Sequence, residues 1–306
     1  MSVAASVAGD PPPPTEQRHA SGDRLDGMSA IEILRLMNDE DGRAVAAVTA
    51  ALPAVADLVE LAVPRVREGG RVHYFGAGTS GRLGVLDAAE LRPTYSLPSG
   101  VVIAHIAGGA SALTEAIEDA EDSWETGAAD AAVVEPGDVV IGLAASGSTP
   151  YVGGALERAR RVGAATALVA CNPDPRLAGL ADVVVVADTG PEVVAGSTRL
   201  KAGTAEKLVI NGFSTALMIA LGHTWRGLMV SVVATNAKLR DRTGRILAEA
   251  LDIDVATARR LLAHADGDLK AAIVTGVAGV DLALARTALA SAGGSVAHAL
   301  TVLGSR

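Results

Sequence analysis

The stretch Arg71-Val-His-Tyr-Phe-Gly-Ala-Gly-Thr-Ser-Gly-Arg82 decides the fold class of this chain of 306 residues. Its first five residues are typical of a strand, a glycine-rich turn follows, and a helical pattern begins at Arg82. Apolar runs of the same kind lie at 71–75, 101–106, 139–143, 165–170 and 183–186, and they alternate with helical patterns. Strands that are apolar throughout and alternate with helices indicate a parallel sheet covered on both faces. We therefore predict an α/β fold with a doubly wound parallel sheet.

The regions on either side of this predicted sheet are expected to be helical. Residues 1 to about 27, with prolines at 11–14, indicate a mobile or draped arm. Ser29 can cap a first helix, and Pro53 marks a break or a helix start in the second helical stretch. Beyond Asn236 the pattern is purely helical, which suggests a small bundle. We predict an N-terminal arm with helices at 1–56, an α/β domain at 57–235 and a small helical domain at 236–306.

Composition narrows the classes of partner and cofactor. The chain carries 26 basic and 35 acidic residues, no Lys/Arg cluster and only 2% aromatic residues, which argues against a nucleic-acid partner. Cys171 is the only cysteine, and the histidines show no HxxxH or HxH spacing, so no metal site is expected. The N-terminus has no basic region of a secretory signal, and the apolar segment from Leu208 to Leu221 is interrupted by polar residues. A cytoplasmic protein without a membrane partner is the expectation.

Two loops combine strand ends with hydroxyl side chains. At the carboxyl ends of parallel strands, helix N-termini offer unpaired amides to anions, and glycines let the backbone approach a phosphate closely. The alternative is a pair of ordinary strand-to-helix turns with Ser/Thr caps, but two such loops on one sheet favour a site for a phosphate monoester. The candidate phosphate ligands are Gly78, Thr79 and Ser80 in the first loop and Ser146, Ser148 and Thr149 in the second.

Two further signals are weaker. The first loop also fits GxGxxG, but the next strand ends in Ala-Gly-Gly at 107–109, without the acid that would hold a ribose, so a dinucleotide site is disfavoured. A polar stretch at 196–204 opens another helix and makes Ser197 and Lys201 candidates for binding the same ligand, although a solvated first turn is the simpler interpretation. Lys238 follows an apolar run and could reach the same cleft.

These residues together resemble the N-acetylmuramic acid 6-phosphate etherases, a family of the sugar isomerase (SIS) superfamily. The matching stretches follow one another in order over nearly the whole chain, at 15–18, 31–41, 76–95, 118–123, 144–152, 192–211 and 228–239. The chain departs from the family pattern at Ser148, where many relatives have Arg, and at Ser231, which replaces a common Asp.

The resemblance implies an SIS-type sheet and a homodimer that binds a phosphorylated amino sugar in peptidoglycan recycling. It implies removal of the lactyl ether to give N-acetylglucosamine 6-phosphate and D-lactate, with no metal or redox cofactor. By motif, Glu90 would be the proton donor and Glu121 the second catalytic carboxylate, while Ser80, Ser146 and Thr149 would line the phosphate site. Elimination and re-addition need one charged and one neutral proton-transfer group, which two carboxyls can supply. A sugar-phosphate isomerase and a non-catalytic sugar-phosphate sensor are the alternatives.

Overall fold

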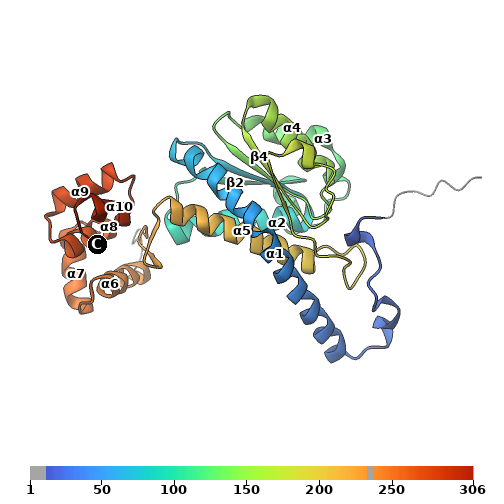
Figure 1. Cartoon of the computed structure of the whole chain (residues 1–306), viewed down its shortest axis with the longest axis horizontal. Coiled ribbons are helices and arrows are strands. Elements are labelled where there is room, and N and C mark those ends of the chain that lie inside the picture. The colour runs from blue at the N-terminus through green and yellow to red at the C-terminus, as the bar shows by residue number, and fades with distance from the viewer. Residues whose placement is uncertain (1–11, 233–236, 306) are drawn as a thin grey trace, which may run out of the picture.

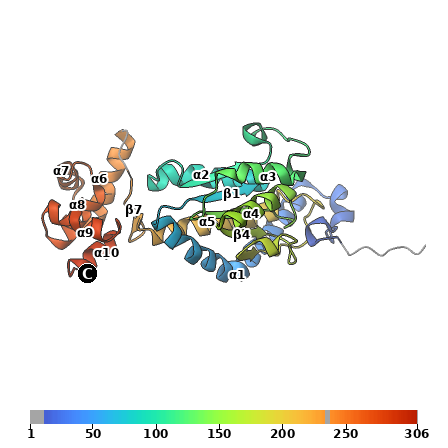
Figure 2. The same cartoon turned by 90° about the horizontal axis from the view of Figure 1, so that it is seen from above.

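The computed structural model describes residues 12–232 and 237–305, with only the backbone of residues 237 and 238. An α/β unit and a separate group of C-terminal helices lie side by side along the longest axis (Figures 1 and 2). The α/β unit contains the five predicted strands, and all five are confirmed. They are β1 (Val72–Gly76), β2 (Val102–Ile106), β3 (Val139–Leu143), β4 (Ala165–Ala170) and β5 (Val183–Val186).

The sheet is parallel throughout, with strand order β2-β1-β3-β4-β5. The chain therefore builds outward from β1 to β2 on one side and continues on the other side from β3. This arrangement places a topological switch point between β1 and β3, where ligands of open α/β sheets bind at the carboxyl ends of the strands.

Helices cover both faces of the sheet, as predicted. The core on one face is shared with α1 (Ala30–Arg67), α2 (Gly78–Tyr95) and α5 (Lys201–Ala220). The core on the other face is shared with α4 (Pro150–Val162), against which α3 (Trp124–Asp130) packs. Short 3₁₀ helices occupy Pro14–Glu16, Gly22–Gly27, Gly109–Leu113, Ala120–Asp122, Ala131–Val133 and Ala178–Leu180.

The predicted break at Pro53 is wrong, because α1 is one helix of 38 residues that contains Pro53 and Pro64. A proline inside a helix costs about 3 kcal/mol. The buried face of α1 packs on α5, and each fully buried Val or Leu on it contributes roughly 1.5–3 kcal/mol. Burial of Val48, Val55 and Leu58 therefore outweighs the lost hydrogen bond. The proposed domain boundary at 56/57 falls inside this helix.

The C-terminal helices form a unit with its own apolar core. They are α6 (Ala237–Leu251), α7 (Val255–His264), α8 (Leu269–Ala278), α9 (Leu282–Ser291) and α10 (Val296–Val302). The helical pattern predicted beyond Asn236 is confirmed over residues 237–305, and Asp254, Asp268 and Asp281 each accept a hydrogen bond from an amide in the first turn of a helix. A hairpin of β6 (Thr224–Trp225) and β7 (Leu228–Met229), which the sequence did not predict, precedes them.

By length and composition alone, α1 could cross a bilayer, and so could α8 and α9 if the bent pair were one span. Each of these helices nevertheless contributes apolar side chains to a hydrophobic core of the described structure. Core helices of folded domains have the same composition.

Candidate active site

The two glycine-rich loops lie next to each other at the switch point. Gly76 at the end of β1 pairs with Leu143 at the end of β3, so the loops that follow these strands leave from neighbouring positions. Gly78 has φ 51° and Gly147 has φ 69°, in the left-handed region that favours glycine. The sequence therefore places both candidate phosphate loops at one edge of the sheet.

The turn from β1 into α2 is possible only with glycine at position 81. A Cβ added to Gly81 would lie 2.7 Å from the carbonyl oxygen of Gly76 and 2.7 Å from Cγ1 of Ile106. The strand and helix therefore approach each other too closely for any side chain. This close approach aims the first turn of α2 at the carboxyl edge of the sheet.

The N-termini of α2 and α4 carry no side-chain cap in the described structure, although most other helices do. Ala77 and Thr149 occupy their N-cap positions without a capping hydrogen bond. Elsewhere the N-terminal groups are bonded by Glu32, Ser123, Asp254, Asp268, Asp281 and Ser295, and by Glu192 at α5. The first-turn amides of α2 and α4 therefore stay available, and an anion at the switch point can bind them.

The second loop is held by its own serines and by the N-terminal arm. The Ser146 hydroxyl accepts hydrogen bonds from the amide of Ser148 at 3.2 Å and from its hydroxyl at 3.1 Å. Asn172, which follows β4, donates to the carbonyl of Ser146 at 2.9 Å and to the hydroxyl of Thr15 at 3.2 Å. Thr15 is fully buried, so this part of the arm is draped over the loop. Motif reasoning found Ser146 and Ser148 but missed Asn172.

Ser80 in the first loop is bonded to a buried carboxylate that sequence reasoning missed. Its hydroxyl lies 2.8 and 3.0 Å from the two carboxylate oxygens of Glu206 on α5. Burial raises the pKa of Glu206 to about 7, while the hydrogen bond from Ser80 acts in the opposite direction. The sequence does contain one signal for Glu206: it is an acidic residue among the apolar residues of α5, next to Ala205 and three residues before Val209.

The Glu206→Gln variant is expected to be more stable than the parent above pH 7. The carboxyl has a pKa of about 7 when folded, against 4.5 as the reference, so the folded state holds its proton more strongly. Stability is therefore lost as pH rises from 4.5 to 7, by about 3 kcal/mol for a shift of this size. Urea unfolding of both proteins at pH 5 and pH 8.5 measures the difference. Parallel stability profiles for parent and variant would contradict the assignment.

Asp87 on α2 fixes the helix that carries the first loop. Its carboxylate accepts hydrogen bonds from Tyr74 of β1 at 2.9 Å, and from Asn211 and Ser214 of α5 at 2.7 and 3.0 Å. Burial raises the pKa of Asp87, and these three donors oppose that shift. The network joins α2 to both the sheet and α5.

A cavity of about 400 Å³ opens beside the first loop and contains Glu121. Its walls are the turn at Ala77 and Gly78 and the segment after β2 that carries Glu121 in a 3₁₀ turn. Arg82 on α2 donates to the carbonyls of residues 113 and 115 at 3.2 and 2.9 Å, and so holds this segment against the loop. The structure thus brings Glu121 and Gly78 to one cavity.

Glu90 is not brought to this cavity within one chain. It lies on α2, twelve residues after Gly78, which corresponds to about 18 Å along a helix. Its side chain is exposed, and Leu86 one turn earlier is 54% exposed on the same side of the helix. A solvent-facing carboxylate with an apolar neighbour occupies this face of α2.

Lys201, in the third polar stretch at 196–204, does not point to the two candidate phosphate loops. The Lys201 ammonium forms a buried ion pair with Glu40 of α1 at 2.5 Å. Glu192 accepts from the amides of Lys201 and Ala202, which occupies the start of α5. Ser197 lines a different cavity, together with Arg18 and His19 of the arm.

Two more positions lie away from the loops. The side chain of Lys238 is outside the described residues, but its backbone belongs to α6, in the C-terminal unit. That unit meets the ends of α1 and α5 at a cavity lined by Val66, Ala220 and Ser291, among others. Ser231 exchanges hydrogen bonds with His223 near the β6–β7 hairpin, so its departure from the family pattern does not touch the loops.

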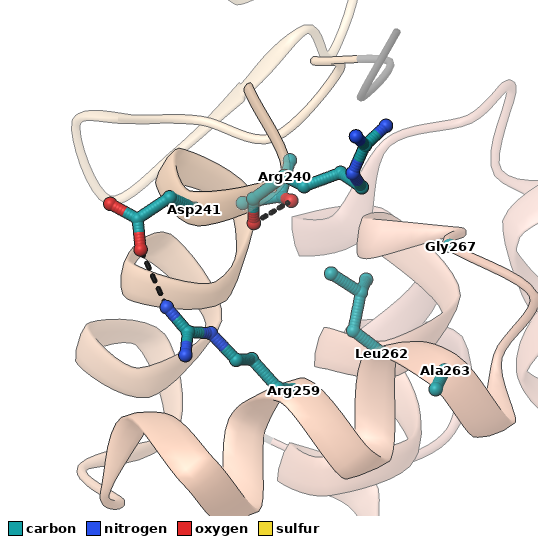
Figure 3. A pocket seen from close by; sticks show the side chains of 7 residues that line it. Arg240, Asp241, Arg259, Leu262, Ala263 and Gly267 are labelled. Atoms are coloured by element: carbon teal, nitrogen blue, oxygen red, sulfur yellow. Dashed lines mark hydrogen bonds and ion pairs between the residues drawn. The ribbon is translucent and has the colours of Figure 1, made fainter. Parts of the chain in front are cut away.

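A further cavity lies away from the two loops, in the C-terminal unit. A cavity of about 480 Å³ lies between α6 and α7, where Arg259 pairs with Asp241 at 2.6 Å (Figure 3). Within residues 12–232 and 237–305, no cluster of three or more His, Cys, Asp or Glu residues could hold a metal ion.

The fold and its loops define a class of protein, and comparison with known sequences and structures agrees. Residues 54–160 match the family described as the glucokinase regulatory protein N-terminal SIS domain. A phosphoheptose isomerase from Francisella tularensis has the same fold, with a TM-score of 0.50 and 16% identity over 62% of this chain and 98% of that chain. The protein is therefore an α/β protein of the SIS class.

Comparison with curated relatives narrows the class to one family. The N-acetylmuramic acid 6-phosphate etherase of Thermobifida fusca is 53% identical over 85% of this chain and 86% of the relative. The etherase of Symbiobacterium thermophilum is 51% identical over 87% of this chain and 89% of the relative. The chain belongs to the N-acetylmuramic acid 6-phosphate etherase family, which confirms the resemblance seen in its motifs.

Proposed function

We propose that this chain is an N-acetylmuramic acid 6-phosphate etherase, a carbon–oxygen lyase that releases D-lactate and leaves N-acetylglucosamine 6-phosphate. The observation that carries the proposal is the pair of uncapped helix N-termini at the switch point, beside a cavity that contains Glu121. Identity of about half the residues with named etherases supports it. The substrate derives from peptidoglycan, so the reaction belongs to cytoplasmic amino-sugar recycling.

Phosphate binding is assigned to the first turns of α2 and α4. Their amides supply backbone donors, and the half-buried hydroxyls of Thr79, Ser146, Ser148 and Thr149 lie in the same two loops. The adjoining cavity of about 400 Å³ has the size of an ordinary small-molecule site. A sugar anchored by its 6-phosphate at the loops would extend into this cavity, toward Glu121.

The elimination step requires two proton transfers, one from C2 and one to the lactyl oxygen on the neighbouring C3. In the open-chain sugar the C1 aldehyde acidifies the proton on C2, and a base removes it. The lactyl oxygen then leaves C3 with a proton from an acid, and water adds across the resulting alkene, with its hydroxyl on C3 and a proton on C2. Glu121, exposed in the cavity wall, is assigned as the base, and Glu90 is assigned as the acid.

The position of Glu90 leads us to infer a homodimer with shared sites. In one chain Glu90 lies about 18 Å along α2 from the first loop, too far to protonate a sugar bound there. Its face of α2 exposes Leu86, and the α1 helix exposes Ile31, Leu34, Val45 and Leu52. A second copy that covers these apolar side chains would bring its own Glu90 to the site, and the first copy would reciprocate.

Replacing Ser80 and Thr149 together by alanine is expected to raise KM for N-acetylmuramic acid 6-phosphate strongly. Each hydrogen bond to a charged group contributes about 1.5–3 kcal/mol, so each lost bond should raise KM about tenfold or more. Steady-state kinetics measures KM, and Thr287→Ala on the exposed side of α9 serves as the matched control. Unchanged KM in the double variant would place the phosphate elsewhere.

The activity itself is tested by incubating the protein with N-acetylmuramic acid 6-phosphate and assaying D-lactate. Stoichiometric D-lactate and N-acetylglucosamine 6-phosphate are expected. An isomerase would return an altered sugar phosphate that keeps its lactyl group. A sensor would bind the substrate and release nothing, and either result would contradict the proposal.

A further inference from the structure

The Glu206 carboxyl lies beside the proposed phosphate site and has no cationic partner among the described residues. It is 1% exposed, and both of its oxygens lie within 3.0 Å of the hydroxyl of Ser80, in the first turn of α2. Among the ion pairs of the described residues, no lysine, arginine or histidine bonds to it. A charged carboxylate without a cationic partner would repel a phosphate bound at this position.

The groups packed around Glu206 do not supply a positive charge. Lys201, earlier on α5, is paired with Glu40 of α1. On the β4 side the Cys171 thiol is buried, and its pKa is raised by burial and then by the charges of Glu206, Glu192 and Asp188. Glu192 is bonded to the amides at the start of α5. The ionisable neighbours of Glu206 on these elements are thus neutral, acidic or already paired.

Ser80 has a single hydroxyl proton, which creates a conflict between two acceptors. While Glu206 is charged, Ser80 donates this proton to the carboxylate. A phosphate bound to the first turn of α2 would then face the lone pairs of Ser80 and a second anion behind them. Two anions in a buried site repel each other strongly, and one of them takes up a proton when it can.

We propose that Glu206, where it is charged, takes up one proton from solvent when a phosphate monoester binds to the first loop. The protonated carboxyl then donates its O–H to the Ser80 oxygen, and Ser80 turns its own O–H toward the phosphate. Only O–H bonds change: solvent gives one proton to Glu206, and release of the ligand returns it. The inference rests on the proposed phosphate site, and it assigns Glu206 as a positioning residue that makes ligand affinity depend on pH.

Burial raises the pKa of Glu206 into a range where this proton exchange occurs near neutral pH. The pKa of Glu206 is about 7 before ligand binds, so the carboxyl is already half protonated near neutral pH. Above that pH each bound phosphate must bring a proton with it, and affinity should fall about tenfold per pH unit. Below pH 6 the carboxyl is mostly protonated, so the coupling disappears.

The test is calorimetric titration of the full chain and of Glu206→Gln with N-acetylglucosamine 6-phosphate, from pH 5 to pH 9. Two buffers of different ionisation enthalpy give the number of protons taken up. The glutamine amide can donate permanently to Ser80, so the variant mimics the protonated carboxyl at nearly the same size. Titration of the ligand's own phosphate is common to both proteins and cancels in the ratio of their Kd values.

The ratio of Kd for the parent to Kd for the variant is expected to be constant below pH 6 and to rise about tenfold per pH unit above pH 7. At pH 8 the parent should take up one more proton than the variant. The control is Glu192→Gln, because Glu192 is a second buried carboxyl with a raised pKa. This variant should keep the pH dependence of Kd seen in the parent. Equal proton counts and parallel profiles with tight binding would overturn the role of Glu206 alone. Absence of binding to both proteins at every pH would overturn the phosphate site as well.

Discussion

The Glu121→Gln variant is expected to turn over N-acetylmuramic acid 6-phosphate about 10²–10⁴ times more slowly than the parent, with little change in KM. The carboxylate lies in the wall of the cavity beside the first loop, and the proposed mechanism assigns it the C2 proton of a sugar anchored there by its phosphate. Glutamine keeps the size of the side chain but cannot accept that proton. Because the proposed phosphate loops are unchanged, kcat and not KM should carry the loss.

The matched control is Glu118→Gln, which alters another carboxylate that lines the same cavity. It should retain parent-like kcat, since the family motif assigns no proton transfer to it. The expected result for Glu121 is measured by initial rates of D-lactate release at saturating substrate. Equal losses in the two variants would indicate that the cavity needs negative charge in general, and would remove the assignment of Glu121 as the base.

The Glu90→Gln variant is expected to lose a similar factor in kcat, and the loss should be repaired in trans. When Glu90→Gln and Glu121→Gln subunits are mixed, a shared site formed by two chains can contain both native carboxylates. Random pairing makes half of the dimers mixed, and each mixed dimer has one intact site, so about a quarter of the parent activity should return. Each variant dissociated and reassociated alone is the control.

Sites confined to one chain would give a different result. Every site in the mixture would then carry one substitution, and activity would stay at the level of the single variants. That outcome would contradict the shared site inferred from the exposed position of Glu90 on α2. It would require α2 or the Glu121 segment to move far enough to bring the two carboxylates together.

The sheet and the two loops were predictable because their signals are local. Each strand is a short apolar run bounded by turns, and each loop follows a strand directly, so spacing alone located them. Pro53 misled the prediction because local backbone chemistry argues for a break, whereas burial of α1 against α5 outweighs it. The hairpin at β6 and β7 has only two residues in each strand, too few for a period to be visible.

The rest of the site depends on contacts between distant parts of the chain. Glu206 meets Ser80 across 126 residues, and Asn172 meets Thr15 across 157, so no sequence pattern links either pair. A helical pattern indicates that α5 is buried, but it does not indicate which residue of α5 faces α2. Glu90 differs from these pairs, because it lies on the same helix as the first loop and the helical spacing alone sets their separation at about 18 Å.

The most direct measurement of the proposed function is the reaction in ¹⁸O-labelled water with N-acetylmuramic acid 6-phosphate as substrate. Elimination of lactate followed by addition of water cleaves the bond between C3 and the lactyl oxygen. The label should therefore appear on C3 of N-acetylglucosamine 6-phosphate and be absent from D-lactate, as read by mass spectrometry. Label in the lactate, or failure to release lactate at all, would contradict the proposed etherase activity and the roles of both glutamates.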